Sequence, residues 1–237
     1  MVNGKDKLIV AIDTDNYEKA VELIYSLEDS VDIYKVGLEN YIASRGKTID
    51  YLKTKNKKIF LDLKFHDIPR TVAGAAEVAL RMGVDMFNVH ISGGGEMVEK
   101  TVERLKEKAA EGQKVPLALG VTVLTSLNED NLYRELGVNR PLWQHAEELA
   151  AMGQLKGLDG VVASPREAER IRERCGPRFL IVTPGVRPLW AKRQDQKRVL
   201  TPAEALKAGA DYLVIGSPVT AADAPEEALA RILREIP

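Results

Sequence analysis

The sequence lacks the features that mark disulfide-bonded, membrane-spanning or nucleic-acid-binding proteins. Its single cysteine, Cys175, allows neither an intramolecular disulfide nor a cysteine-based zinc cluster, which suits a reducing cytoplasm. No apolar run approaches the ~20 residues needed to cross a bilayer, and residues 1–7 lack the apolar stretch of a signal peptide. The 34 basic and 35 acidic side chains give a formal net charge of -1, so no positive field favours nucleic acid or an anionic membrane. We therefore expect a compact cytoplasmic protein.

Short apolar runs alternate with amphipathic segments along almost the whole chain. The runs are rich in Val, Ile, Leu or Phe and lack polar alternation, as parallel strands do when both faces are buried. Eight such runs within 237 residues predict an α/β fold, a single (β/α)8 TIM barrel domain over residues 1–237. An open doubly wound sheet is the structural alternative, although such sheets rarely need eight units. The expected strands are 8–13, 33–37, 58–64, 86–91, 116–123, 160–163, 179–184 and 212–216.

Helical spacing fills the gaps between the expected strands. Ser164-Pro165 and Thr201-Pro202 each place a capping residue before a proline, which is typical of the first turn of a helix. The stretch from 187 to 200 is too charged for the core and forms either a solvated loop or a lid over a site. The expected helices are 17–27, 72–82, 96–111, 141–152, 166–174 and 225–235.

The run from residue 59 to residue 69 concentrates charge at the end of an apolar strand. Asp62 and Lys64 are two residues apart, so they point to the same side of a strand, and Asp67 follows just past its end. A lone pair of this spacing is more often a buried salt bridge, because unpaired charges are costly to bury. The D-x-K-x-x-D pattern at the carboxyl end of a strand instead favours a ligand site, since parallel α/β folds bind ligands there.

The other expected strands also end in polar or small residues. Gly185 and Gly216, after strands seven and eight, together favour a phosphate site, because backbone N–H groups bind phosphate at this corner of barrels. His90 either touches a substrate or supports another side chain. The Ser-Gly-Gly-Gly run at 92–95 lacks the ending of a phosphate loop and indicates a turn into the next helix. In chain order the strand ends are Asp13, Lys35, Asp62 with Lys64, His90, Thr125, Ser164, Gly185 and Gly216.

Several short sequence motifs occur one after another along the chain, most of them at the expected strands or strand ends. The most specific is Asp-Leu-Lys-Phe-His-Asp-Ile-Pro-Arg-Thr at 62–71, and others stand at 11–13, 34–37, 121–126, 183–188, 195–198 and 215–218. On these residues the chain resembles the orotidine 5′-monophosphate decarboxylases of the bacterial type over nearly its whole length. The resemblance implies a carboxy-lyase that makes uridine 5′-monophosphate in pyrimidine biosynthesis. It also implies a homodimer that uses no metal and no organic cofactor.

The resemblance implies roles for the charged residues around strand three. Lys64 is expected to donate a proton to C6 of the pyrimidine as carbon dioxide leaves, and Asp62 to face the departing carboxylate. Lys35 and Asp67 are expected to complete the catalytic array. Because no cofactor delocalises the resulting carbanion, its stabilisation must come from a fixed ammonium group in a water-poor pocket.

The remaining implied residues bind the substrate. Asp13 and Lys35 are expected to contact the ribose hydroxyls, and Thr125 to lie near the pyrimidine. Asp67 and Thr71 are expected to reach the active site of the neighbouring subunit. The phosphate is expected to be held by Arg187, Gln196, Gly216 and Ser217.

Ser217 departs from the family pattern, which has an arginine after the strand-eight glycine. A serine hydroxyl cannot reproduce the bidentate contact that arginine makes with phosphate. Three explanations stand side by side: compensation by a nearby cation such as Arg187, Lys192 or Arg193, a modified or impaired form of the protein, or a different substrate. Ser217→Arg is accordingly expected to tighten the binding of a phosphorylated substrate.

Two other interpretations compete with this assignment. The related 3-hexulose-6-phosphate synthases and 3-keto-L-gulonate-6-phosphate decarboxylases share the strand-three motif, but they use magnesium and have an acidic metal ligand at the position of Lys35. A lysine there repels a divalent cation and argues against them. The other alternative is a degraded barrel that binds a partner without catalysis, and only Ser217 supports it.

Overall fold

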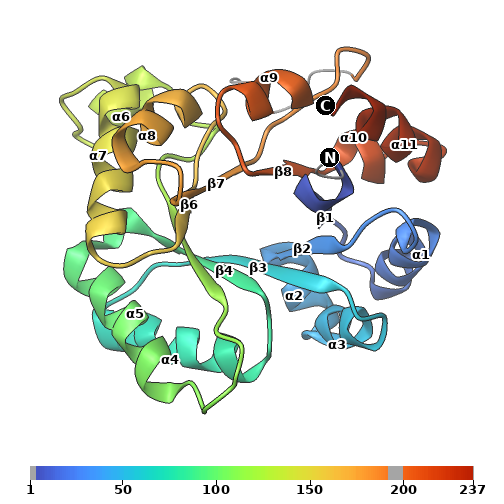
Figure 1. The fold of residues 1–237 in the computed structure, drawn as a ribbon, viewed down its shortest axis with the longest axis horizontal. Coiled ribbons are helices and arrows are strands. Elements are labelled where there is room, and N and C mark those ends of the chain that lie inside the picture. The colour runs from blue at the N-terminus through green and yellow to red at the C-terminus, as the bar shows by residue number, and fades with distance from the viewer. Residues whose placement is uncertain (1–3, 192–199, 237) are drawn as a thin grey trace.

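The structure, a computed structural model, describes residues 4–191 and 200–236. Eight parallel strands close into a barrel in chain order, with β8 paired to β1 (Figure 1). The expected TIM barrel is confirmed, and the open doubly wound sheet was wrong as an alternative. The span of the domain, residues 1–237, stays a prediction. The strands are β1 (Leu8–Ile12), β2 (Ile33–Gly37), β3 (Lys58–Phe65), β4 (Met86–His90), β5 (Leu117–Val121), β6 (Gly160–Val162), β7 (Leu180–Thr183) and β8 (Tyr212–Ile215).

Helices connect the strands and form the outer layer of the barrel (Figure 1). The six expected helices are confirmed, and their ends lie within three residues of the expected ones. None of the helices in the described ranges combines the length and apolar character that crossing a membrane requires. The α-helices are α1 (Tyr17–Leu27), α2 (Leu38–Ser44), α3 (Lys47–Thr54), α4 (Pro69–Arg81), α5 (Gly95–Lys108), α6 (Glu129–Arg134), α7 (Leu142–Leu155), α8 (Ala168–Cys175), α9 (Pro202–Lys207), α10 (Ser217–Thr220) and α11 (Pro225–Glu235). Two short 3-10 helices, Gly4–Lys7 and Ile91–Gly93, precede β1 and α5.

The two proline-based start signals have different outcomes. Thr201 caps α9, where its side chain accepts from the Glu204 N–H and the Glu204 carboxylate accepts from the Thr201 N–H. The prediction at Ser164-Pro165 is wrong, because a turn follows Ser164 and α8 begins only at Ala168. Ser164 is instead fully buried just after β6.

Two apolar layers explain why the strands lack polar alternation. Alternate side chains of each strand fill the barrel interior, and the side chains between them pack against the helices. In β1, all five residues are buried: Ile9 and Ala11 belong to the interior cluster, and Leu8, Val10 and Ile12 belong to the outer one. Since both faces are buried, both must be apolar.

Candidate active site

The barrel interior changes from apolar to charged at the carboxyl ends of three neighbouring strands. A residue two positions beyond an interior side chain also faces the interior, because side chains alternate along a strand. Ala11 is followed in this way by Asp13, Ile33 by Lys35, and Phe60 by Asp62. Strand alternation therefore directs these charged side chains to one place.

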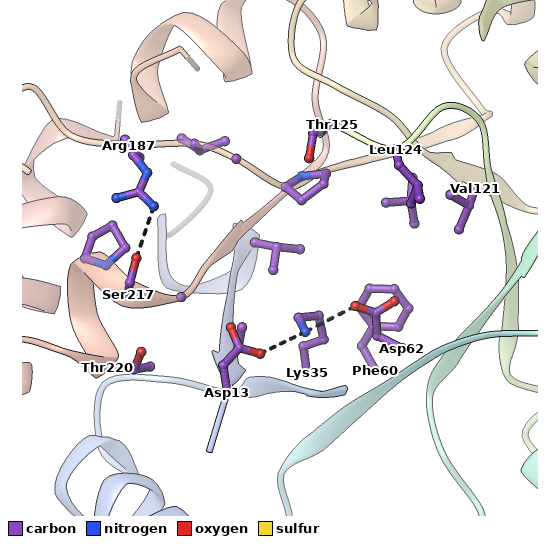
Figure 2. A pocket seen from close by; sticks show the side chains of 18 of the residues that line it. Asp13, Lys35, Phe60, Asp62, Val121, Leu124, Thr125, Arg187, Ser217 and Thr220 are labelled. Atoms are coloured by element: carbon purple, nitrogen blue, oxygen red, sulfur yellow. Dashed lines mark hydrogen bonds and ion pairs between the residues drawn. The ribbon is translucent and has the colours of Figure 1, made fainter. Parts of the chain in front are cut away.

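A cavity of about 510 Å³ opens at these strand ends, and Figure 2 shows side chains that line it. Its volume is typical of a site for a small organic ligand. Phe60, Val121 and Leu124 make part of the lining apolar, which lowers the polarity around the charged groups. Most residues predicted from the sequence line this cavity: Asp13, Lys35, Asp62, Lys64, Thr125, Gly185, Arg187, Gly216 and Ser217.

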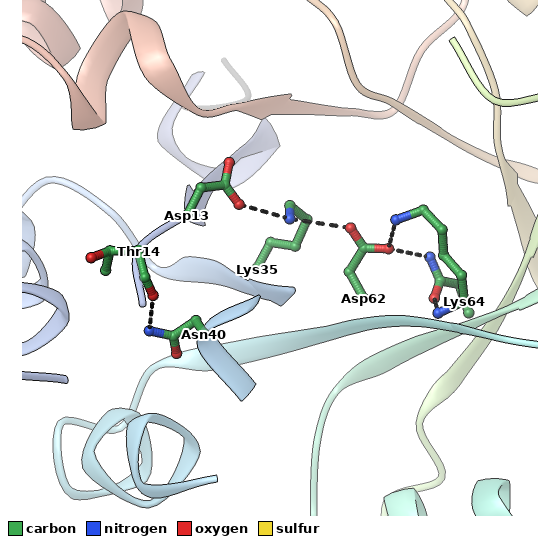
Figure 3. A network of polar contacts seen from close by, with 7 residues as sticks. Asp13, Thr14, Lys35, Asn40, Asp62 and Lys64 are labelled. Carbon is green, nitrogen blue, oxygen red and sulfur yellow. Dashed lines mark hydrogen bonds and ion pairs between the residues drawn. The ribbon is translucent and has the colours of Figure 1, made fainter. Parts of the chain in front are cut away.

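Asp13, Lys35, Asp62 and Lys64 form a chain of alternating charges (Figure 3). Lys35 Nζ lies 3.3 Å from Asp13 Oδ1 and 3.1 Å from Asp62 Oδ2, and Lys64 Nζ lies 2.7 Å from Asp62 Oδ1. The two central side chains, Lys35 and Asp62, are only 12% and 10% exposed. Each of these buried charges therefore has opposite charges beside it, which offset the loss of hydration.

The surroundings keep both central groups ionised. Burial alone would lower the pKa of Lys35, but the carboxylates of Asp62 and Asp13 outweigh burial and raise it above its ordinary value. Burial alone would raise the pKa of Asp62, but Lys35, Lys64 and an N–H donor from Asn88 lower it below its ordinary value. The cavity thus presents fixed charges of both signs at neutral pH.

Asn88, in the middle of β4, was missed by sequence reasoning. Its Nδ2 donates to Asp62 Oδ1 at 2.7 Å, and its Oδ1 accepts from the backbone N–H of Lys64 at 2.8 Å. A signal for it was present in the sequence, because Asn88 is a lone uncharged polar residue within an otherwise apolar run from Met86 to Val89.

Two glycines allow the backbone to approach the cavity closely. A Cβ atom on Gly216 would lie 2.9 Å from Asp13 Oδ2, so the Asp13 side chain would have to shift to admit it. Gly185 has a φ of 78°, in the left-handed region that glycine adopts readily. Glycine at 216 therefore leaves the Asp13 side chain in its place, and glycine at 185 allows the left-handed backbone conformation.

Arg187 and Ser217 meet across the ends of β7 and β8, where Arg187 Nη2 donates to Ser217 Oγ at 3.2 Å (Figure 2). A guanidinium and a hydroxyl group side by side can both donate hydrogen bonds to a phosphate. Of the three cations proposed to compensate for Ser217, Arg187 is described, and it contacts Ser217. The other two candidates for compensation, Lys192 and Arg193, and the predicted phosphate ligand Gln196 lie outside the described residues.

The backbone around Arg187 is anchored on both sides. Val186 bridges Leu200, and the Arg187 N–H donates to the Leu200 carbonyl at 2.9 Å. Trp190, whose role the sequence left open, donates from Nε1 to Glu235 Oε1 of α11 at 2.9 Å. These contacts fix the backbone from which the Arg187 side chain enters the cavity.

Four residues expected near the site are not among the described residues that line the cavity: Asp67, Thr71, His90 and Ser164. Asp67 and Thr71 are exposed, and Asp67 Oδ1 accepts from the Ile68 N–H at 2.6 Å. Among the described residues, one chain therefore places Asp13 and Asp62 in the cavity but not Asp67. His90 is partly buried beside His66, with ring centroids 5.2 Å apart, and burial together with His66 lowers the pKa of His90.

Within residues 4–191 and 200–236, no group of three or more His, Cys, Asp or Glu side chains is arranged to hold a metal ion. Lys35 Nζ contacts both the Asp13 and the Asp62 carboxylates, which are the oxygen ligands that magnesium would otherwise prefer. The donor set does not fit a divalent cation, which disfavours the magnesium-dependent alternatives.

Comparisons with known proteins give matches that cover nearly the full length of this chain. A model of the Orotidine 5′-phosphate decarboxylase / HUMPS family matches residues 6–232. The orotidine 5′-phosphate decarboxylase of Moorella thermoacetica is 47% identical over 236 residues, covering 99% of this chain and 94% of the relative. That of Nostoc sp. is 48% identical over 234 residues and 98% of both chains. The crystal structure of orotidine 5′-phosphate decarboxylase from Lactobacillus acidophilus superposes with a TM-score of 0.85 at 35% identity, covering 97% of this chain and 98% of that chain.

Proposed function

The chain belongs to the orotidine 5′-phosphate decarboxylase / HUMPS family and decarboxylates orotidine 5′-monophosphate in pyrimidine biosynthesis, and we propose that Lys64 donates the proton of this reaction. The observation that carries the proposal is the alternating chain of charges, in which the Lys64 ammonium lies 2.7 Å from Asp62 within the cavity. A cation fixed in this way is suited to a carboxy-lyase that uses no metal and no organic cofactor.

The proposed reaction breaks the bond between C6 of the pyrimidine and the carboxyl carbon. Carbon dioxide leaves, the electron pair stays on C6, and the ammonium of Lys64 gives C6 a proton. Lys64 becomes a neutral amine, which regains a proton from solvent after the product leaves. The negative charge on C6 develops next to a cation that is already in place, and such preorganised electrostatic stabilisation is often the largest part of catalysis.

Asp62 has two roles in this proposal. It accepts a hydrogen bond from Lys64 Nζ and so aims the proton donor. It also faces the carboxylate of the substrate, and two carboxylates side by side repel one another until one becomes neutral carbon dioxide. Lys35 holds Asp62 from the other side and keeps it ionised.

The rest of the substrate is proposed to bind along the cavity. Asp13 and Lys35 contact the ribose hydroxyls, and Thr125 lies near the pyrimidine. The phosphate is bound at the ends of β7 and β8, where Arg187 and Ser217 stand together. Gly216 leaves room for this group, and Gln196 is proposed as a further ligand. Binding energy from the distant phosphate can then help to organise the reacting end.

We further propose a homodimer in which Asp67 and Thr71 reach the active site of the neighbouring subunit. Both residues are exposed, although they follow the strand that carries Asp62 and Lys64. Apolar side chains of α2 and of the N-cap of α4 are also exposed, and such groups are typical of the core of an interface: Leu38, Ile42 and Ile68. A cytoplasmic location is proposed because the one cysteine, Cys175, is unpaired.

Turnover in the presence of a chelator tests the function. We expect the purified chain to consume orotidine 5′-monophosphate, followed as a loss of absorbance, at the same rate with and without excess EDTA, because ammonium groups rather than a metal stabilise the carbanion. The control substrate is 3-keto-L-gulonate 6-phosphate with magnesium, which should not react. Turnover that EDTA abolishes would contradict the cofactor-free mechanism. No turnover at high substrate concentration would contradict the function. It would mean either that Ser217 disables the site or that the chain acts on another phosphorylated substrate.

Mixing two inactive variants tests the shared site. We expect Lys64→Ala and Asp67→Ala to be nearly inactive alone, and to regain roughly a quarter of the unmodified activity when co-expressed. A mixed dimer then has one site with both substitutions and one intact site, because Asp67 serves the neighbouring subunit. Activity per mole of co-expressed protein measures the recovery.

The matched control for this recovery is Lys64→Ala co-expressed with Asp62→Ala. Asp62 and Lys64 of one chain line the same cavity, so every site in that mixed dimer keeps a substitution and no activity should return. Absence of recovery with Asp67→Ala, in a sample that sedimentation shows to be dimeric, would mean that Asp67 does not act across the interface.

A further inference from the structure

Asn88 is a polar side chain that faces the barrel interior, two positions beyond Met86. It lies at the centre of β4, it is fully buried, and it is not among the described residues that line the cavity. The residues on either side of it, Phe87 and Val89, are apolar and equally buried. An amide in such a place destabilises the fold unless it is hydrogen-bonded, so its partners indicate what it does.

The pairing of β3 with β4 is interrupted opposite Asn88. Leu61 pairs with Phe87, and the next pair is Phe65 with Val89. The chain thus advances four residues along β3 but only two along β4, which leaves residues 62–64 opposite the single residue 88. Bulges of this kind occur often beside active sites, where they redirect side chains.

The Asn88 side chain makes the bonds that the interrupted ladder cannot make. Its Oδ1 accepts from the Lys64 backbone N–H at 2.8 Å, and its Nδ2 donates to Asp62 Oδ1 at 2.7 Å. Lys64 has a φ of 50°, a left-handed conformation that is unfavourable for a residue with a side chain. A backbone in that conformation persists only where the surroundings hold it.

We propose that Asn88 is a positioning residue for the decarboxylation, which holds the β3 bulge so that the Lys64 ammonium and the Asp62 carboxylate meet the substrate in a fixed geometry. The inference rests on the proposed function, because the geometry matters only if these two groups act on the substrate. Asn88 itself is not among the described residues that line the cavity, so in this proposal it acts on the reaction only through Asp62 and Lys64. One amide thus fixes both the backbone of the proton donor and the side chain that aims it.

The charged and titratable groups around this amide come from three strands. Asp62 and Lys64 lie on β3, Lys35 on β2 beyond Asp62, and His90 on the same strand as Asn88. Burial has the largest effect on the pKa of Asp62 and raises it. Lys35, Lys64 and the N–H donor of Asn88 act in the opposite direction and together lower this pKa below its ordinary value. Loss of this donor should therefore make Asp62 easier to protonate.

Two variants separate the hydrogen bonds. Asn88→Leu removes both at similar side-chain volume, and Asn88→Asp keeps the acceptor for Lys64 but removes the donor to Asp62. We expect kcat to fall about 10- to 100-fold in both, which corresponds to the loss of a hydrogen bond to a charged group. KM should stay within about threefold, because Asn88 does not line the cavity.

The pH profile distinguishes positioning from a purely structural role. In Asn88→Asp, protonation of the new carboxyl group restores a donor to Asp62, so its kcat relative to the unmodified chain should rise as the pH falls, whereas that of Asn88→Leu should not. The control is Thr101→Val, which loses a buried hydrogen bond to the Met97 carbonyl in α5. Thr101→Val should lower thermal stability but leave kcat and the pH profile unchanged. A folded Asn88→Leu with unchanged kcat would overturn the proposal.

Amide hydrogen exchange tests the geometry without turnover and without a variant that must fold. In the unmodified chain, the Lys64 amide should exchange at least about 10³-fold more slowly than in an unstructured peptide, because Asn88 Oδ1 accepts its hydrogen. Rapid exchange there would refute the role of Asn88 even if the chain is an active decarboxylase. Slow exchange in a chain without turnover would instead mean that the proposed function, and not the positioning, has failed.

Discussion

Lys64→Ala is expected to lower kcat/KM for orotidine 5′-monophosphate by at least about 10⁴-fold, because one side chain has two roles in the proposed reaction. As a general acid, Lys64 protonates C6, and groups in that role typically contribute 10²- to 10⁴-fold. As a fixed cation, it stabilises the developing carbanion, and removal of one such group typically costs about 10²- to 10³-fold. The loss should lie mainly in kcat and is measured by steady-state kinetics with excess EDTA.

Two controls show whether the loss belongs to the chemistry. Lys64→Arg keeps a positive charge but hardly releases a proton, because the guanidinium pKa lies far above neutral pH, so it should remain strongly impaired. Lys100→Ala removes an exposed lysine that forms an ion pair with Glu103 on the surface, and it should leave kcat unchanged. A kcat/KM for Lys64→Ala within about tenfold of the unmodified value would exclude Lys64 as the proton donor.

The barrel and three of its charged strand ends could be predicted because they depend on the order of apolar and charged residues within single strands. Apolar runs such as β1, with both faces buried, indicate parallel strands wherever they occur. Residues two apart on a strand face the same side, so Asp13 faces the interior like Ala11, and Asp62 like Phe60. This prediction needs no knowledge of the neighbouring strands. The prediction that Asp62 and Lys64 share a side is confirmed by the 2.7 Å between their charged atoms.

The features that were missed depend on pairing between strands. The bulge in β3 exists only relative to β4, so a pattern read along β3 alone cannot reveal that residues 62–64 face Asn88. Asp67 lies beyond the strand end, where alternation no longer applies, so its spacing alone could not predict whether it lies in the cavity of its own chain, and its expected place in the neighbouring subunit rested on the family resemblance. At Ser164-Pro165, burial of Ser164 in the barrel overrode a local helix-start signal.

Arg187→Met should reduce kcat/KM for orotidine 5′-monophosphate by about 10²- to 10³-fold, because the phosphate dianion would lose a charge-assisted contact. Among the described residues that line the cavity, Arg187 is the only arginine, and it lies beside Ser217 at the ends of β7 and β8. Methionine keeps much of the length of the side chain without the charge. The measurement compares this substrate with orotidine, which has no phosphate, and kcat/KM for orotidine should change by less than about threefold.

Ser217→Arg is the converse of that change. A second guanidinium beside Arg187 should lower KM for the phosphorylated substrate at least about tenfold, since arginine can bind phosphate through two parallel hydrogen bonds and serine cannot. The gain should shrink as salt is added and should be absent for orotidine, because it comes from attraction between charges at the phosphate. An unchanged or higher KM would mean that Arg187 and Ser217 already satisfy the phosphate. Equal losses in Arg187→Met for both substrates would mean that Arg187 supports the fold around Ser217 rather than the substrate.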